Sequence, residues 1–79
     1  MALTIEDRMT LQLIDEGLRT ASDEDALMMF GMVDGEELFT PTGTPTELCT
    51  EIAKKITKSR PHLQARVCNF VSAKGQSAP

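Results

Sequence analysis

Apolar residues recur at helical spacing in several stretches of the chain. The clearest stretch follows position 45, where apolar residues repeat every three or four positions: Leu48, Cys49, Ile52, Ala53 and Ile56. Such spacing places the apolar side chains on one side of a helix. The whole pattern predicts an all-α domain with four helices, at about 5–20, 23–33, 45–57 and 60–72. It leaves room for at most a vestigial strand at 37–40.

A capping signal precedes each predicted helix. Side-chain oxygens at such positions accept hydrogen bonds from the unpaired N–H groups of the first turn, and proline loses no hydrogen bond at the first helical position. Four segments have this form: Thr4-Ile5-Glu6-Asp7, Ser22-Asp23-Glu24-Asp25, Thr44-Pro45-Thr46-Glu47 and Ser59-Arg60-Pro61. We therefore predict that Thr44 caps the third helix and that Ser59 caps the fourth.

The first predicted helix has two apolar sides. At about 100° per residue, its apolar residues fall into two groups: Ile5, Met9 and Leu13 on one side, and Leu11, Ile14 and Leu18 on the other. A surface helix needs only one apolar side. The second side therefore indicates a homodimer contact through the helix at about 5–20, and the alternative is that the monomer covers both sides.

The second predicted helix is almost continuously apolar between positions 26 and 33. We expect it to be the central helix of the core, because core filling is a common use of methionine-rich runs. Asp34-Gly35 is predicted to end it as a turn. Leu38 and Phe39 are then expected to enter the core, and residues 41–44 to form a tight connection.

Length and composition restrict the function. A chain of 79 residues with 41% hydrophobic and 25% charged residues predicts one domain, spanning 1–79, that is too small for a deep catalytic pocket. We therefore expect no enzyme activity. No apolar run approaches the roughly 20 residues of a membrane span, and no signal peptide is evident, so a cytoplasmic location is expected. Cys49 and Cys68 are interpreted as small buried hydrophobes, and with His62 they form no metal-ligand set. No metal or cofactor is predicted.

The net charge of −4 is divided unevenly along the chain. Residues 1–44 carry ten Asp and Glu residues against two Arg, a net −8, whereas residues 45–79 carry six Lys and Arg residues against two Glu, a net +4. This division is typical of a basic face for a polyanion on an acidic body. The alternative is that Lys54, Lys55 and Lys58 favour the negative end of a helix dipole.

The run IAKKITKSRPHLQARV resembles the centre of a helix-turn-helix domain, in which two helices meet across a turn of about three or four residues. The preceding ALMMFGMVDGEELFTPTG resembles the first helix and connecting segment of winged helix-turn-helix regulators. The resemblance covers about 23–75, with 1–22 as an additional N-terminal helix and 76–79 as a frayed tail. Thr57 and Lys58 differ from the small and apolar residues usual at their positions, and no full wing is expected after Lys74-Gly75.

This resemblance implies a small, sequence-specific DNA-binding regulator of transcription, with the helix at about 60–72 as its recognition helix. Base edges would be read by His62, Arg66 and Asn69, since Asn pairs with adenine and Arg with guanine. Basic residues near the turn would hold phosphates of double-stranded DNA. The complete expected DNA site is Lys54, Lys55, Lys58, Ser59, Arg60, His62, Gln64, Ala65, Arg66 and Asn69.

The alternative function is a small acidic protein-interaction module, an adaptor or inhibitor of phage or plasmid type. Its acidic N-terminal half would bind a basic protein partner or mimic nucleic acid. The surface charge distinguishes the two functions. A continuous positive face through Lys54, Lys58, Arg60 and Arg66 would favour DNA. Interruption of that face by Glu47 and Glu51 would favour the interaction module.

Overall fold

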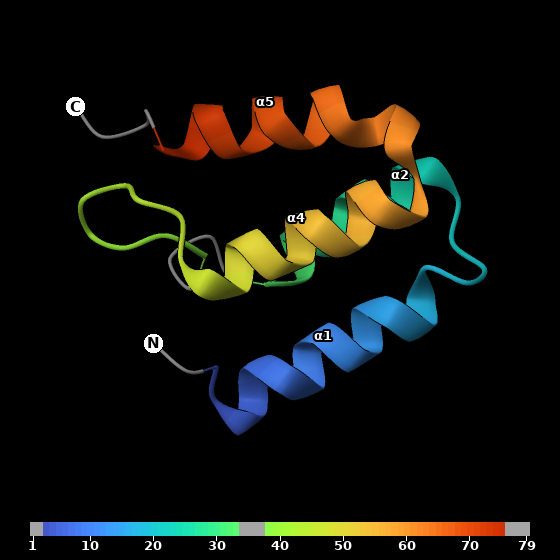
Figure 1. Ribbon diagram of the computed structural model, residues 1–79, viewed down its shortest axis with the longest axis horizontal. Helices are drawn as coiled ribbons and strands as arrows, with labels where there is room; N and C mark the ends of the chain where they lie inside the picture. The colour runs from blue at the N-terminus through green and yellow to red at the C-terminus, as the bar shows by residue number, and fades with distance from the viewer. Residues whose placement is uncertain (1–2, 34–37, 76–79) are drawn as a thin grey trace.

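The computed structural model describes residues 3–33 and 38–75. Their elements, in chain order, are α1 (Ile5–Gly17), α2 (Asp23–Met28), the 3-10 turn η1 (Met29–Met32), α4 (Glu47–Ser59), the 3-10 turn η2 (Pro61–Leu63) and α5 (Gln64–Gly75). Within these ranges there is no strand, so the prediction of an all-α domain is confirmed (Figure 1). The predicted turn at Asp34-Gly35 and the tail at 76–79 lie outside the described residues.

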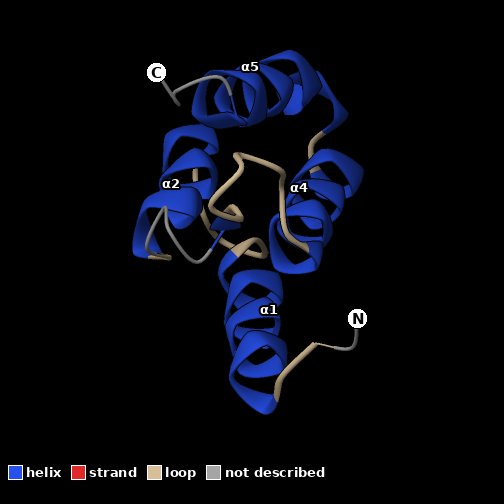
Figure 2. Ribbon diagram, turned by 90° about the vertical axis from the view of Figure 1, so that its left-hand side faces the viewer, coloured by secondary structure: helices blue, strands red, loops and turns tan. Residues whose placement is uncertain are grey.

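Helix α4 contributes more of the described core residues than any other helix. It packs against α1, η2 and α5, and its buried residues are those that the spacing predicts: Leu48, Cys49, Ile52 and Ile56. Figure 2, which looks along the helices, shows α5 above, α1 below, and α2 and α4 on opposite sides. Leu38 is also fully buried, and Phe39 is half-buried. The core therefore lies between α4 and the elements around it.

A second helix begins at Asp23 as predicted, but the prediction that it continues to about 33 as the central helix of the core is wrong. Helix α2 ends at Met28 and continues as the 3-10 turn η1. The tighter turn directs Met29 and Phe30 into the core, where Phe30 stacks on Phe70 with ring centroids 4.5 Å apart. Met28 is instead 67% exposed. A helix of only six residues presents one side to the core, so continuous apolar sequence did not mean burial on every side.

The first two capping predictions are confirmed. The Asp7 N–H donates to Thr4 Oγ1 at 3.0 Å and the Thr4 N–H donates to Asp7 Oδ2 at 3.2 Å, a capping box. Ser22 caps α2 by accepting from the Asp25 N–H at 3.2 Å.

The first helix, α1, ends at Gly17 rather than at about residue 20. A Cβ atom at Gly17 would lie 2.7 Å from Met29 Cε, so the tip of the Met29 side chain packs against Gly17.

The prediction that Thr44 caps the third helix is wrong, because Thr46 is its N-cap. Thr46 Oγ1 accepts from the Cys49 N–H at 3.3 Å, and the Thr46 N–H donates to the Leu38 carbonyl at 2.8 Å. Thr44 belongs to the preceding tight turn, in which Gly43 has φ of 87°. Pro45 forms an isolated antiparallel bridge with Phe39, which is all that the described residues show of the expected vestigial strand.

The prediction that Ser59 caps the fourth helix is also wrong. Ser59 is the last residue of α4, and Arg60 precedes η2 without a side-chain capping bond. Pro61 is the first residue of η2, which suits its fixed φ angle. The connection between α4 and α5 thus consists of residues 60–63, close to the expected length. Leu63 and Val67 are buried, with Phe70 and Val71 half-buried beside them.

Candidate interaction surfaces

Arg60, predicted to hold a DNA phosphate, is bound inside the molecule. Its Nε donates to Asp23 Oδ1 at 3.1 Å, and its Nη1 donates to the Leu18 carbonyl at 3.1 Å. Its Nη2 donates to the Ala21 carbonyl. Only 16% of the side chain is exposed. These contacts fasten the α1–α2 connection to the end of α4, so the guanidinium is committed to the fold.

His62 and Arg66, predicted to read bases, pair with the first turn of α2. His62 Nε2 lies 2.8 Å from Asp23 Oδ2, and the two terminal nitrogens of Arg66 donate to Glu24 at 2.8 and 3.4 Å. The hydrogen bond with His62 lowers the pKa of Asp23, with a further contribution from Arg60. The hydrogen bond from Arg66 lowers the pKa of Glu24 and raises the pKa of Arg66 itself.

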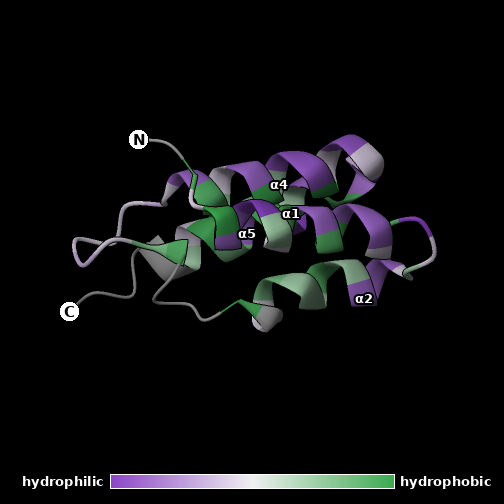
Figure 3. Cartoon of the chain, turned by 90° about the horizontal axis from the view of Figure 1, so that it is seen from below, coloured by the Kyte–Doolittle hydropathy of each residue, from purple (hydrophilic) through white to green (hydrophobic). Residues whose placement is uncertain are grey.

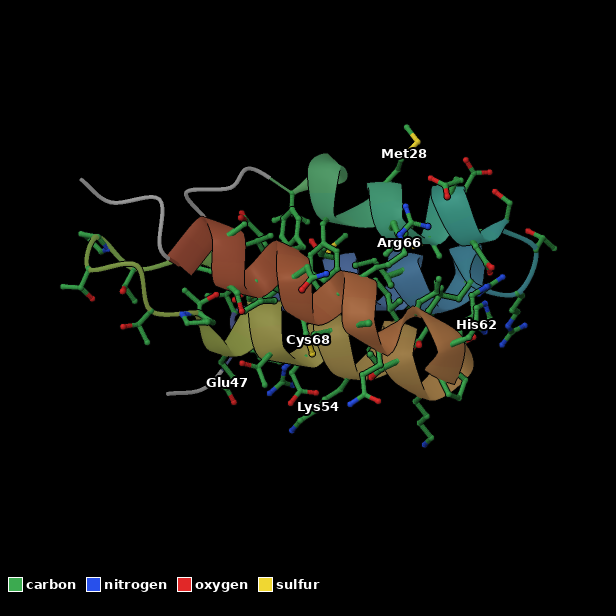
Figure 4. All side chains as sticks on the ribbon, turned by 90° about the horizontal axis from the view of Figure 1, so that it is seen from above. Met28, Glu47, Lys54, His62, Arg66 and Cys68 are labelled. Atoms are coloured by element: carbon green, nitrogen blue, oxygen red, sulfur yellow. The ribbon has the colours of Figure 1, made fainter. Side chains whose placement is uncertain are left out.

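Two of the three predicted phosphate-binding lysines also have acidic partners. Lys55 Nζ lies 2.6 Å from Asp15 Oδ2, and Lys54 Nζ lies 3.6 Å from Glu51 Oε1. Lys58 is exposed and forms no ion pair with a described residue. Figure 4 shows Arg66 directed towards α2 on one side of α5, whereas Lys54 points outward from α4 on the other side. The basic residues therefore do not gather on one continuous face.

The remaining predicted DNA contacts are exposed polar or small residues. Gln64, Ala65 and Asn69 lie on the solvent side of α5, and Ser59 Oγ accepts from Arg60 Nη1 at 3.4 Å. The structure thus leaves a slim, uncharged strip on α5, and Arg66 beside it is paired to Glu24. This arrangement lacks the positive charge that supplies most of the affinity for a DNA backbone.

The outer face of α1 is an exposed apolar stripe. Ile5, Met9 and Leu13 are 79%, 60% and 61% exposed, whereas Leu11 and Ile14 on the opposite side are buried. In Figure 3, seen from the side of α1, hydrophobic residues lie along this helix among hydrophilic ones. The interpretation that the monomer covers both apolar sides is therefore wrong, since only one side faces the core.

Carboxylates lie next to this stripe. At about 100° per residue, Glu16 falls between Ile5 and Met9, and Glu6 falls beside Leu13. Both are exposed. We define the outer face of α1 by these five residues. Helix α1 as a whole carries four acidic residues against Arg8, a net −3. The face therefore combines apolar side chains with negative charge.

A hollow of about 380 Å³ lies between α4 and α5. Its wall includes the buried Cys49 and the exposed Cys68. Burial raises the pKa of the Cys49 thiol. The expectation that both cysteines are buried is thus correct for Cys49 and wrong for Cys68. The described residues contain no group of three or more His, Cys, Asp or Glu side chains placed to hold a metal ion.

Within the described ranges, no helix has the length and apolarity needed to cross a membrane. No protein-family model, curated protein or solved structure matches the chain. The helix-turn-helix resemblance consequently remains a resemblance in sequence.

Proposed function

We propose that this protein is a small acidic interaction module that binds a basic amphipathic helix of a partner protein along the outer face of α1. The observation that carries the proposal is the exposure of Ile5, Met9 and Leu13 on the helix side opposite the core. Three large apolar side chains in line at a spacing of four residues match the way in which one helix packs along another.

The size of the stripe favours a charged partner. Complete burial of such a side chain contributes about 1.5–3 kcal/mol, so three partly exposed ones contribute about 3–6 kcal/mol together. Association itself costs about 4–15 kcal/mol, so apolar burial alone holds a partner weakly. Lysine or arginine residues opposite Glu6 and Glu16 would add attraction and accelerate the encounter. We therefore expect reversible, salt-sensitive binding.

The same charges disfavour a second copy as the occupant. Two α1 helices packed on each other would bring together two helices of net charge −3, on chains that each carry −4. Like charges across an interface oppose association. The homodimer through this helix stays a prediction, but a basic partner fits the surface better.

DNA binding through the helix at about 60–72 and the helix-turn-helix interpretation also stay predictions. Arg60, His62 and Arg66 would have to leave Asp23 and Glu24 before they could contact DNA. Each such exchange replaces an existing ion pair, so the net gain from a phosphate is small. The geometry consequently supports the interaction module better.

The proposal is tested with two synthetic helical peptides that share an apolar stripe but are flanked by Lys in one and by Glu in the other. We expect the Lys-flanked peptide alone to bind, with amide NMR shifts concentrated on α1. Met9→Gln and Leu13→Gln should each weaken binding about fivefold or more, the effect of about 1 kcal/mol of lost apolar burial.

Met28→Gln is the matched control, because Met28 is equally exposed but lies on α2. It should leave peptide affinity unchanged. Two further measurements test the alternatives: sedimentation tests self-association, and titration with duplex DNA tests DNA binding. Self-association abolished by Leu13→Gln would assign the face to a second copy. If the protein binds duplex DNA at low salt with amide NMR shifts on α5, and binds neither peptide, the helix-turn-helix function replaces the proposal.

A further inference from the structure

The carboxyl ends of α1 and α4 border an open hollow of about 530 Å³, which we name the basic hollow. Both helices run in the same direction in Figure 1, so these ends lie at the same side of the molecule. The lining residues are Asp15, Leu18, Arg19, Lys55, Lys58 and Ser59. Most of the polar side chains among them are cationic.

The charge of the basic hollow contrasts with that of the protein. Three cations and one carboxylate give it a formal charge of +2, on a chain of −4. Among the described basic side chains, those without an ion pair to another described residue are Arg8, Arg19 and Lys58. Two of these three line the same hollow. Unpaired positive charge is therefore concentrated at this place.

The hollow already holds one anionic group. Asp15 Oδ2 lies 2.6 Å from Lys55 Nζ, and the Lys55 side chain is only 27% exposed. The contact shows that Lys55 is positioned to bind an oxyanion from the direction of α1. Asp15 would also repel a second anion. Its removal should therefore strengthen binding of any anionic ligand.

The carbonyl ends of α1 and α4 repel an anion, but they offset only part of the positive charge of the hollow. The carbonyl end of a helix carries about half a negative charge, so two ends contribute about −1 against the formal +2. Arg60 Nη1 donates to the Leu18 carbonyl at 3.1 Å and offsets some of this negative charge at the end of α1. The balance favours an anion.

We propose that the basic hollow binds the dianion of a phosphate monoester. The flat guanidinium of Arg19 and the ammonium of Lys58 suit the oxygens of a phosphate, and two unpaired cations match a double negative charge. Ser59 Oγ accepts a hydrogen bond from Arg60, which leaves its own proton to donate to the ligand. The proposal is independent of the outer face of α1.

Inorganic phosphate is the first probe, titrated into the protein at pH about 8.5, where both inorganic phosphate and a phosphate monoester are mainly dianions. Sodium chloride keeps the ionic strength constant. Amide NMR shifts are expected at residues 18–20 and 58–60. Arg19→Gln and Lys58→Gln should each weaken binding about three- to fivefold, and Asp15→Asn should strengthen it by a similar factor.

Two variants with the same charge changes elsewhere are the controls. Arg8→Gln removes a cation from α1 outside the hollow, and Glu47→Gln removes an acid at the opposite end of α4. Both should leave the affinity unchanged. The proposal is overturned if Arg8→Gln weakens binding as much as Arg19→Gln, or if chloride alone produces the same shifts.

A phosphoserine peptide and its unphosphorylated form distinguish two sources of the same chemistry. Tighter binding of the phosphopeptide than of inorganic phosphate would assign the hollow to a phosphorylated side chain. Equal affinity would assign it to a small phosphate ester. Binding of the unphosphorylated peptide with equal affinity would contradict the proposal.

Discussion

Arg60 joins segments that lie far apart in the sequence. Its guanidinium contacts the carboxylate of Asp23 and the carbonyls of Leu18 and Ala21, which precede it by 37 to 42 positions. Carbonyl oxygens at the end of a helix need donors, and the partly buried guanidinium of Arg60 has five N–H groups to offer. Arg60 therefore acts as a structural cross-link between the α1–α2 connection and the end of α4.

The acidic partners of this region should make stability depend on pH. His62 lowers the pKa of Asp23 below 3.8, and Arg66 lowers that of Glu24 below 4.5. Because the folded pKa values lie below the unfolded ones, the pairs stabilise the fold above pH about 4.5. Their contribution is lost as the pH falls through the folded values. We expect urea unfolding to show this loss as the pH falls below about 4.5.

A double variant, Asp23→Asn with Glu24→Gln, should show a smaller loss of stability on acidification than the unmodified protein. Asp25→Asn is the control, because Asp25 lies in the same turn and forms no ion pair with a described residue. It should retain most of the pH dependence. An identical acid profile for the double variant would show that these pairs contribute nothing to stability.

At the scale of elements, the start of α4 depends on a contact with the preceding turn. The Thr46 hydroxyl accepts from the Cys49 N–H and donates to the Leu38 carbonyl at 2.9 Å. Among the described residues, the hydrogen bond of the Thr44 hydroxyl is to the exposed Thr42 hydroxyl, at 3.3 Å. Thr46→Ala should therefore cost about 1–2 kcal/mol, and Thr44→Ala less than about 0.5 kcal/mol, in chemical denaturation. Equal costs would mean that the cap has been assigned incorrectly.

The apolar side of α4 should dominate stability. Ile52 is completely buried, so Ile52→Ala should lower the free energy of unfolding by about 2–4 kcal/mol through lost burial and a residual cavity. Ile5→Ala removes the same atoms from an exposed position and should change it by less than about 0.5 kcal/mol. Thermal or urea melts measure both. Similar losses of stability in the two variants would show that Ile5 is not exposed.

These elements show what could be predicted from the sequence. The spacing of Leu48, Ile52 and Ile56 defines the buried side of α4 without further information. Thr44 and Thr46 are both suitable caps, and the choice between them depends on Leu38, whose position follows only from the tertiary fold. The two apolar sides of α1 were also visible, but the spacing alone could not identify the side that faces the core.

At the scale of the molecule, the acidic half of the chain folds onto the basic half. Four ion pairs join residues before position 34 to residues after position 54: Lys55–Asp15, Arg60–Asp23, His62–Asp23 and Arg66–Glu24. The uneven charge of the sequence predicted a basic face for a polyanion. Much of that positive charge is instead complemented within the chain. Pairing between side chains about 40 positions apart has no periodic signal in the sequence. The sequence therefore predicted that these basic residues form one DNA-binding surface.

Central packing should also determine the order of local unfolding. Helix α4 is covered by α1, η2 and α5, whereas α2 has six residues and ends at the exposed Met28. Native-state hydrogen exchange should therefore be slowest at the amides of Ile52 and Ile56 and at least tenfold faster in α2, because local opening exposes fewer buried groups there. Equal protection of both helices would indicate that the molecule opens only as a whole.

The two thiols give the folded protein a built-in chemical marker. Cys68 is exposed and Cys49 is buried, with its pKa raised by that burial, so only Cys68 should react readily with a maleimide. Mass spectrometry should detect one added label under native conditions and two after denaturation. The delay before the second label is added measures how often the centre of the molecule opens. A single dye on Cys68 would also report on the hollow between α4 and α5 without any substitution in the chain.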